Sequence, residues 1–244
     1  AVDLDDPDHV LYAYLSDPAG DEEGGTGDAC CALGWLAAES VRDFGGRQPT
    51  DRPFFQPGSM DPLLARAVAN LAGARPGATI LDPMCGTGGV LVEAALVGAD
   101  VLGVDAQAKM ARGARENLAA FLDSTRDATA GVDGLPEPGE WATMRGDATR
   151  LALRANAATG VVFDAPYGRQ SKIETHALDD LVAGALAESR RVADRCVLVA
   201  DRDWREAARD AGWTVDAAFQ RRVHASLDRY VLVLDDDAVD ARAV

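Results

Sequence analysis

The sequence predicts an α/β protein built on a doubly wound, mostly parallel sheet. Between residues 63 and 234, short apolar segments typical of buried strands alternate with segments of helical periodicity. Apolar segments end at Asp82, Asp105 and Asp164, and a glycine-dense turn follows Asp82. Because ligands collect at the carboxyl ends of parallel strands, we expect the functional site at this edge of the sheet.

The composition is that of a globular protein with one sizeable core. The 244 residues are 48% hydrophobic, and no apolar run reaches the roughly 18 residues that a membrane span needs. No signal-peptide pattern opens the chain, so we expect a soluble, cytoplasmic protein and favour a monomer. The chain begins at Ala1 without methionine, which suggests a fragment or a processed form.

The chain is strongly acidic, with 40 acidic and 24 basic residues and a net charge of −16. Only Lys109 and Lys172 are lysines, and abundant Asp with so little Lys resembles the proteins of salt-adapted archaea. Such a surface does not exclude an RNA partner, because at about 1 M ionic strength the Debye length is only about 3 Å. Residues 1–30 contain nine acidic residues and no Lys or Arg, whereas residues 164–234 are close to neutral. We therefore expect any RNA-facing surface in the C-terminal half.

The cysteines do not form a metal-binding pattern. Cys30, Cys31, Cys85 and Cys196 lack CxxC spacing and have no neighbouring histidine. We therefore expect reduced, buried thiols and no metal site.

The first residues are predicted to stand apart from the main domain. Residues 1–16 have the pattern of two short strands around a proline-containing turn, and residues 17–29 that of a polar, glycine-rich linker. We predict a first segment of residues 1–30 and a main domain of residues 31–244, which opens with a helix over residues 33–44. An acidic extension that packs on the main domain is the alternative for the first segment.

An ordered turn, RPFFQPGSMDP from Arg52 to Pro62, follows in the main domain. A helix is predicted next, over residues 63–71. Phe54 and Phe55 fit either core positions or a segment that lies over a cofactor.

The stretch TILDPMCGTGGVLVE, Thr79 to Glu93, has the residues of a nucleotide-binding unit. A strand runs into a turn in which Gly86, Gly88 and Gly89 allow positive φ and close approach of a ligand to the backbone. Leu91 stands where the dinucleotide fingerprint GxGxxG needs its third glycine, which disfavours a nicotinamide dehydrogenase.

Residues 79–82, 87–97 and 101–105 form a predicted strand–helix–strand unit whose second strand ends in Asp105. A carboxylate there can accept both ribose hydroxyls of a nucleoside cofactor, and the alternative is a surface acid. Glu93 in the helix either supports the turn or is solvated.

The later elements complete a predicted seven-stranded sheet. They are a helix over 107–121, an exposed loop over 123–140, strands over 141–145, 160–164 and 196–200, helices over 178–192 and 203–211, and the strands 213–224 and 229–234 of an antiparallel hairpin. The predicted fold is therefore Rossmann-like, with a mostly parallel sheet and a C-terminal antiparallel hairpin strand.

Several of these stretches resemble the class I S-adenosylmethionine methyltransferases. The turn LDPMCGTGG is similar to their motif I, and DAPYGR to motif IV, the D/N-P-P-Y of amino-methyltransferases. With RPFFQPG and the closing hairpin, they resemble the archaeal tRNA guanine-N2 methyltransferases that act at position 10. The match departs once, because Ala165 replaces the first proline. Residues 1–16 are similar to the closing strands of a THUMP domain, an RNA-binding module found before such methyltransferases.

The resemblance implies a complete set of site residues. The implied catalytic residues are Asp164, Ala165, Pro166 and Tyr167. Those implied to bind S-adenosylmethionine are Gln56, Pro57, Asp82, Met84, Cys85, Gly86, Thr87, Gly88, Gly89, Asp105, Ala106, Asp147 and Ala148. In the family pattern Asp147 meets the adenine amino group, with the Ala148 N–H at a ring nitrogen, and the alternative for Asp147 is the cap of a following helix.

The residue types at motif IV suit methylation of an exocyclic amine, a poor nucleophile because its lone pair is delocalised into the ring. Asp164 and the Ala165 carbonyl can accept its two N–H groups, and the carboxylate offsets the positive charge that grows on the nitrogen. Tyr167 can stack on the extruded base, while Pro166 holds the turn.

The leading hypothesis is methyl transfer from S-adenosylmethionine to the N2 amine of a tRNA guanine, giving the mono- and the dimethylated base. An N6-adenine or other amino-methyltransferase is an alternative, although such enzymes usually have Asn in place of Asp164. A non-catalytic cofactor-binding RNA module is a second alternative, which Ala165 leaves open. Cytosine-C5 methylation needs a motif IV cysteine, and Cys85 lies in the glycine turn instead.

Overall fold

The computed structural model describes residues 9–16, 30–37, 43–125, 136–166, 178–224 and 227–236. It divides into two compact units, residues 1–43 and residues 44–244.

In the smaller unit, strand β1 (Leu11–Ser16) pairs antiparallel with strand β2 (Cys30–Trp35). The predicted helix over residues 33–44 is wrong at its start, because Leu33 to Trp35 belong to β2. Hydrogen bonds to β1 outweigh the helix propensity of this Leu- and Ala-containing stretch. The predicted linker and the first eight residues lie outside the described residues.

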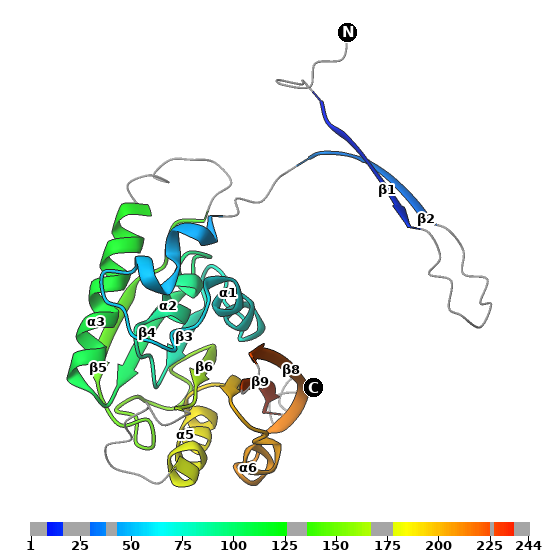
Figure 1. Ribbon diagram of the computed structural model, residues 1–244. Coiled ribbons are helices and arrows are strands. Elements are labelled where there is room, and N and C mark those ends of the chain that lie inside the picture. Colours follow the sequence, from blue (N-terminus) through cyan, green and yellow to red (C-terminus); the bar gives the residue numbers. More distant parts are fainter. Residues whose placement is uncertain are drawn as a thin grey trace, which may run out of the picture. The chain divides into compact units, whose positions relative to one another are not determined.

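The described residues of the larger unit form a seven-stranded sheet with the order β5-β4-β3-β6-β7-β9-β8 (Figure 1). The strands are β3 (Thr79–Asp82), β4 (Asp100–Asp105), β5 (Trp141–Arg145), β6 (Gly160–Asp164), β7 (Arg195–Ala200), β8 (Thr214–His224) and β9 (Leu227–Asp235). Strands β3 to β7 are parallel, and β9 is antiparallel to both of its neighbours. The predicted doubly wound sheet with a closing hairpin is confirmed.

Helices cover both faces of the sheet (Figure 1). One face carries α1 (Pro62–Leu71), α2 (Gly89–Ala95) and α3 (Ala108–Leu118), which continues as the π-helix η3 (Ala119–Asp123), and the other carries α5 (Leu178–Val192) and α6 (Arg205–Asp210). The short 3₁₀-helices η1 (Phe44–Arg47) and η2 (Pro49–Asp51) precede α1. Among the described residues, no helix combines the length and apolar character needed to cross a membrane.

Strand β6 illustrates why the central strands have continuous apolar sequences. Val162 packs with the core on the α1–α3 face, whereas Val161 and Phe163 pack with the core on the α5–α6 face. A strand buried on both faces has no polar alternation.

The functional edge follows from the connections between strands. From β3 the chain continues to β4 and β5 on one side, and from its neighbour β6 it continues to β7 on the other. The topological switch point therefore lies between β3 and β6. The turn after Asp82 and the residues after Asp164 leave the sheet side by side at this point.

Candidate functional site at the sheet switch point

The glycine turn after β3 is a tightly hydrogen-bonded loop. The Gly88 N–H donates to the Cys85 carbonyl (2.7 Å), and the Cys85 N–H donates to the Val104 carbonyl (2.9 Å) on β4. Gly86 and Gly88 have φ of 51° and 76°, a left-handed conformation that favours glycine. Helix α2 therefore begins at Gly89, two residues later than predicted.

Asp105 at the end of β4 anchors this loop. Its Oδ2 accepts a hydrogen bond from the Gly86 N–H (3.0 Å), and its Oδ1 accepts one from the Gln107 N–H (2.8 Å). The side chain is half-buried at the end of the strand. Asp105 is thus a structural part of the loop as well as a candidate ribose acceptor, and the surface-acid alternative is wrong.

Three carboxylates converge at the switch point. Asp82 is buried and accepts a hydrogen bond from the Met84 N–H at Oδ1 (3.0 Å). Burial raises the pKa of Asp82 well above its usual value, and the nearby carboxylates of Asp105 and Asp164 raise it further. Asp82 therefore holds its proton more tightly than an ordinary carboxyl, and a cationic ligand at this site would favour its ionised form.

The residues after β6 are held by the neighbouring strand. The Ala165 N–H donates to the Val199 carbonyl of β7 (2.8 Å), so the sheet ladder continues one residue beyond Asp164. Ala165 is buried, and Asp164 and Pro166 are half-buried. Tyr167, the fourth predicted catalytic residue, lies outside the described residues.

The RPFFQPG segment is fastened to the glycine loop through Asn117 of α3. The buried Asn117 amide accepts from the Phe54 N–H (2.9 Å) and donates to the Phe54 carbonyl (2.9 Å) and to the Thr87 carbonyl (2.8 Å). Phe54 packs against Gly113, where an added Cβ would lie 2.0 Å from the ring. Phe55, in contrast, is exposed. The core alternative therefore fails for Phe55.

A second link to this segment runs through Thr87. Its hydroxyl lies 3.1 Å from the Ser59 hydroxyl, which donates to the Gln56 carbonyl (2.8 Å). The turn containing Gln56 and Pro57 therefore lies beside the glycine loop, as the prediction of a covering segment requires.

The predicted adenine-binding pair lies at the end of β5. Asp147 Oδ1 accepts from the N–H (2.9 Å) and the hydroxyl (2.8 Å) of Thr149. Asp147 forms an isolated β-bridge with Arg150, and no helix lies between β5 and β6 in the described part of the chain. The helix-cap alternative for Asp147 is therefore wrong. Ala148 is buried, whereas Ala106 after β4 is exposed.

The Cys85 thiol is buried, unlike the exposed thiolate that a cysteine nucleophile requires. Its side chain packs against Gly103 of β4, where an added Cβ would lie 3.1 Å from Sγ. Burial, with the charges of Asp82 and Asp105, raises the pKa of the Cys85 thiol well above its usual value. Among the described residues, no group of three or more His, Cys, Asp and Glu side chains could hold a metal ion.

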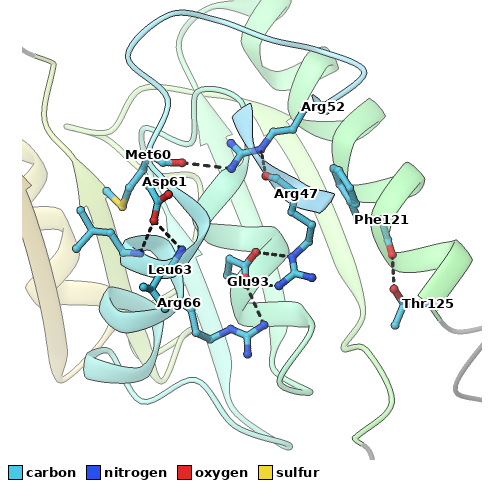
Figure 2. A network of polar contacts seen from close by, with 10 residues as sticks. Arg47, Arg52, Met60, Asp61, Leu63, Arg66, Glu93, Phe121 and Thr125 are labelled. Atoms are coloured by element: carbon cyan, nitrogen blue, oxygen red, sulfur yellow. Dashed lines mark hydrogen bonds and ion pairs between the residues drawn. The ribbon is translucent and has the colours of Figure 1, made fainter. Parts of the chain in front are cut away.

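A buried polar network behind the loop was not identified from the sequence (Figure 2). Glu93 of α2, with 1% of its surface exposed, accepts from Arg47 Nε (2.7 Å) and pairs with Arg66 Nη2 (2.9 Å). Both guanidinium groups also lie over the Phe44 ring, at 5.3 and 5.6 Å from its centroid. The solvated alternative for Glu93 is wrong. The signal in the sequence is a glutamate inside the apolar run VLVEAA.

The sequence of residues 49–230 matches the UPF0020 family, described as the RMKL-like methyltransferase domain. The tRNA (guanine(10)-N2)-dimethyltransferase of Methanothermobacter thermautotrophicus is 34% identical over 82% of this chain and 56% of its own length. The enzyme of the same name from Pyrococcus abyssi is 32% identical over 96% of this chain and 64% of its own length. The chain thus spans only about three fifths of these curated relatives.

Solved structures agree in fold. TrmN from Thermus thermophilus has a TM-score of 0.56 at 22% identity, covering 85% of this chain and 56% of its own. The protein SMU.472, in its complex with SAH, has a TM-score of 0.52 at 16% identity, covering 75% of this chain and 54% of its own. Since the family match spans most of the sheet and both strand ends of the site, this chain belongs to the UPF0020 family of RMKL-like methyltransferase domains.

Proposed function

We propose that this chain transfers a methyl group from S-adenosylmethionine to the exocyclic N2 amine of a guanine in tRNA, the target being position 10. The observation that carries the proposal is the adjacency of two strand ends. The glycine loop after β3 and the Asp164–Ala165 turn after β6 leave neighbouring strands at one switch point.

The residues at the switch point fit the cofactor. S-adenosylmethionine supplies a methyl group on a positively charged sulfur and also carries an ammonium group. Asp105 and Asp164 lie where they can supply complementary negative charge, and Asp82 adds to it when the cationic ligand favours its ionised form. Asp105 offers half-buried acceptors for the ribose hydroxyls. The solved complex of the fold relative SMU.472 with SAH is consistent with this assignment.

Asp164 and Ala165 then prepare the amine. The carboxylate and the Ala165 carbonyl accept the two N–H groups of the amine, and the carboxylate stabilises the charge that develops as the nitrogen–carbon bond forms and the carbon–sulfur bond breaks. The amine proton is released as the methylated base forms. The Ala165 N–H is fixed on Val199, so the peptide after it is oriented by the sheet.

The nucleic-acid partner is inferred from the curated relatives, both named tRNA (guanine(10)-N2)-dimethyltransferases. A row of paired residues across the sheet supports an RNA-facing edge: Asp164 pairs with Val199, Val199 with Val231 and Val231 with Phe219. The exposed Arg221 and Arg222 lie just beyond this row at the end of β8. Guanidinium groups there would contact phosphates next to the target nucleotide.

Methyl transfer to an unmodified tRNA transcript tests the proposal. We expect transfer to a transcript with guanosine at position 10 and none to one with inosine there, because inosine lacks the N2 amine. The Asp164→Ala variant should still bind S-adenosylmethionine, with a methylation rate at least about a hundredfold lower. Cofactor binding without transfer would favour a non-catalytic RNA module, and transfer to an adenine would favour the N6 alternative.

A further inference from the structure

Arg52 donates hydrogen bonds to three other residues, of which Arg47 and Met60 are drawn with it in Figure 2. Its guanidinium, on a side chain that is 6% exposed, donates from Nε to the Arg47 carbonyl (3.3 Å), from Nη2 to the Met60 carbonyl (3.2 Å) and from Nη1 to the Thr87 hydroxyl (3.4 Å). The segment before α1 and the loop after β3 are therefore joined by one side chain.

Gly89 provides the space that this guanidinium occupies. A Cβ added at Gly89 would lie 2.5 Å from Arg52 Nη1 and 3.1 Å from Arg52 Cζ. Gly89 does not have positive φ, so an alanine there would conflict with Arg52 rather than with its own backbone. Arg52 and Gly89 thus fit together as one contact at the first residue of α2.

Burying the Arg52 guanidinium costs solvation free energy. Burial lowers the pKa of Arg52, and the nearby carboxylates of Glu93 and Asp61 offset this effect only in part. An apolar side chain of similar volume would fill the same space but would leave the Arg47 and Met60 carbonyls and the Thr87 hydroxyl without this donor. A guanidinium differs from it in supplying directed hydrogen bonds, here to the Thr87 hydroxyl.

The position of Thr87 also determines the position of Gly86, the preceding residue of the glycine loop. Its carbonyl is held by Asn117 and its hydroxyl by Arg52 and Ser59, while the adjacent Gly86 N–H is held by Asp105. A shift of Thr87 would therefore displace Gly86 and the two residues before it. Removing Arg52 leaves the Asn117 contact in place, so we expect the loop to shift while the fold remains.

We infer that Arg52 is a positioning residue, which holds Thr87 and Gly89 so that the glycine loop keeps the geometry that binds the cofactor. The inference rests on the proposed function, because it assigns S-adenosylmethionine to this loop. It adds a role for a residue that lies outside the predicted catalytic and cofactor-binding sets.

The experiment is a double-mutant cycle read by calorimetric titration with S-adenosylmethionine. We expect Arg52→Ala and Gly89→Ala each to weaken binding about tenfold. The double variant should be no weaker than either single variant, since both remove the same contact. Free guanidinium at millimolar concentration should restore part of the affinity of Arg52→Ala, and Arg52→Lys should not recover it fully.

Arg195→Ala is the matched control. Arg195 also donates to a backbone carbonyl, that of Leu71, and pairs with Asp235, but it lies at the opposite end of the parallel strands. We expect it to lower the melting temperature without changing cofactor affinity. Unchanged affinity in Arg52→Ala, or additive losses in the double variant, would overturn the positioning role. Absence of binding by the unmodified chain would instead overturn the proposed function.

Discussion

The Asp105 carboxylate accepts a hydrogen bond from the Gly86 N–H at 3.0 Å, so the end of strand β4 fixes the turn that follows strand β3. Such a side chain links two strand ends of the site before any ligand arrives. Its loss should therefore affect binding twice, through the loop and through the ribose hydroxyls.

We predict that Asp105→Ala weakens S-adenosylmethionine binding by about tenfold or more, because a charge-assisted hydrogen bond is worth about 1.5–3 kcal/mol. Calorimetric titration measures the loss. Asp100→Ala is the control: Asp100 Oδ1 accepts from the Glu140 N–H (2.8 Å) at the other end of β4. Equal losses of affinity in the two variants would contradict the predicted role.

Cofactor affinity should rise with pH. Burial and the neighbouring Asp105 and Asp164 raise the pKa of Asp82, yet a cationic ligand favours its ionised form. Binding of S-adenosylmethionine should therefore release the proton of Asp82. The release occurs at pH values between the pKa of Asp82 in the complex and its higher pKa in the free protein. Titration in buffers of different ionisation enthalpy detects this proton, and Asp82→Asn should abolish its release. If the unmodified chain and Asp82→Asn released the same number of protons on binding, Asp82 would not be the group that loses the proton.

The same carboxyl should make the fold less stable as pH rises. A raised pKa means that the folded state binds the proton more tightly, so the contribution of Asp82 to stability falls as pH rises from the ordinary carboxyl value through the raised one. We expect Asp82→Asn to be more stable than the unmodified chain at neutral pH, with weaker cofactor binding. Thermal unfolding at several pH values tests the sign, and a lower melting temperature for Asp82→Asn at neutral pH would contradict it.

The buried pair of Glu93 with Arg47 and Arg66 should be important for stability. Replacing Glu93 by Ala leaves two guanidinium groups without their carboxylate, which we expect to cost about 3–5 kcal/mol. The matched variant Glu188→Ala removes the more exposed pair with Arg191, whose ionic part is worth about 1 kcal/mol or less. Urea denaturation compares them, and similar losses would argue against the predicted difference.

A proline at position 165 should destabilise the chain even though it restores the family motif. Proline has no N–H, so Ala165→Pro removes the hydrogen bond to the Val199 carbonyl, at a cost of about 1 kcal/mol. Ala165→Gly keeps the N–H and is the control for side-chain changes. Thermal unfolding and the methylation rate separate stability from activity. If the proline variant were more stable than the unmodified chain, the rigid proline ring would stabilise the turn more than the hydrogen bond to Val199 does.

The central parallel strands were predictable because β6 and β7 are buried on both faces and read as apolar runs. Strand β6 is an example, with Val161 and Val162 on opposite sides of the sheet. The strand-ending aspartates Asp82, Asp105 and Asp164 then located the site without knowledge of side-chain contacts. The smaller unit was harder, because strand β2 depends on pairing with β1 rather than on its own periodicity.

The support of the loop could not be predicted because its partners are distant in sequence. Glu93 and Arg47 are 46 positions apart, and nothing local to either residue indicates that they meet. The dual role of Asp105 was hidden for the same reason. Its spacing from Asp82 indicated a ligand contact, but only the three-dimensional arrangement shows that its carboxylate holds Gly86.

The Arg52 guanidinium fills the volume that a side chain at position 89 would need, so the residues allowed at the two positions depend on each other. Any larger residue at position 89 would force the Arg52 guanidinium to leave its place beside the first residue of α2. In an alignment of the family, arginine at position 52 should therefore co-vary with glycine at position 89.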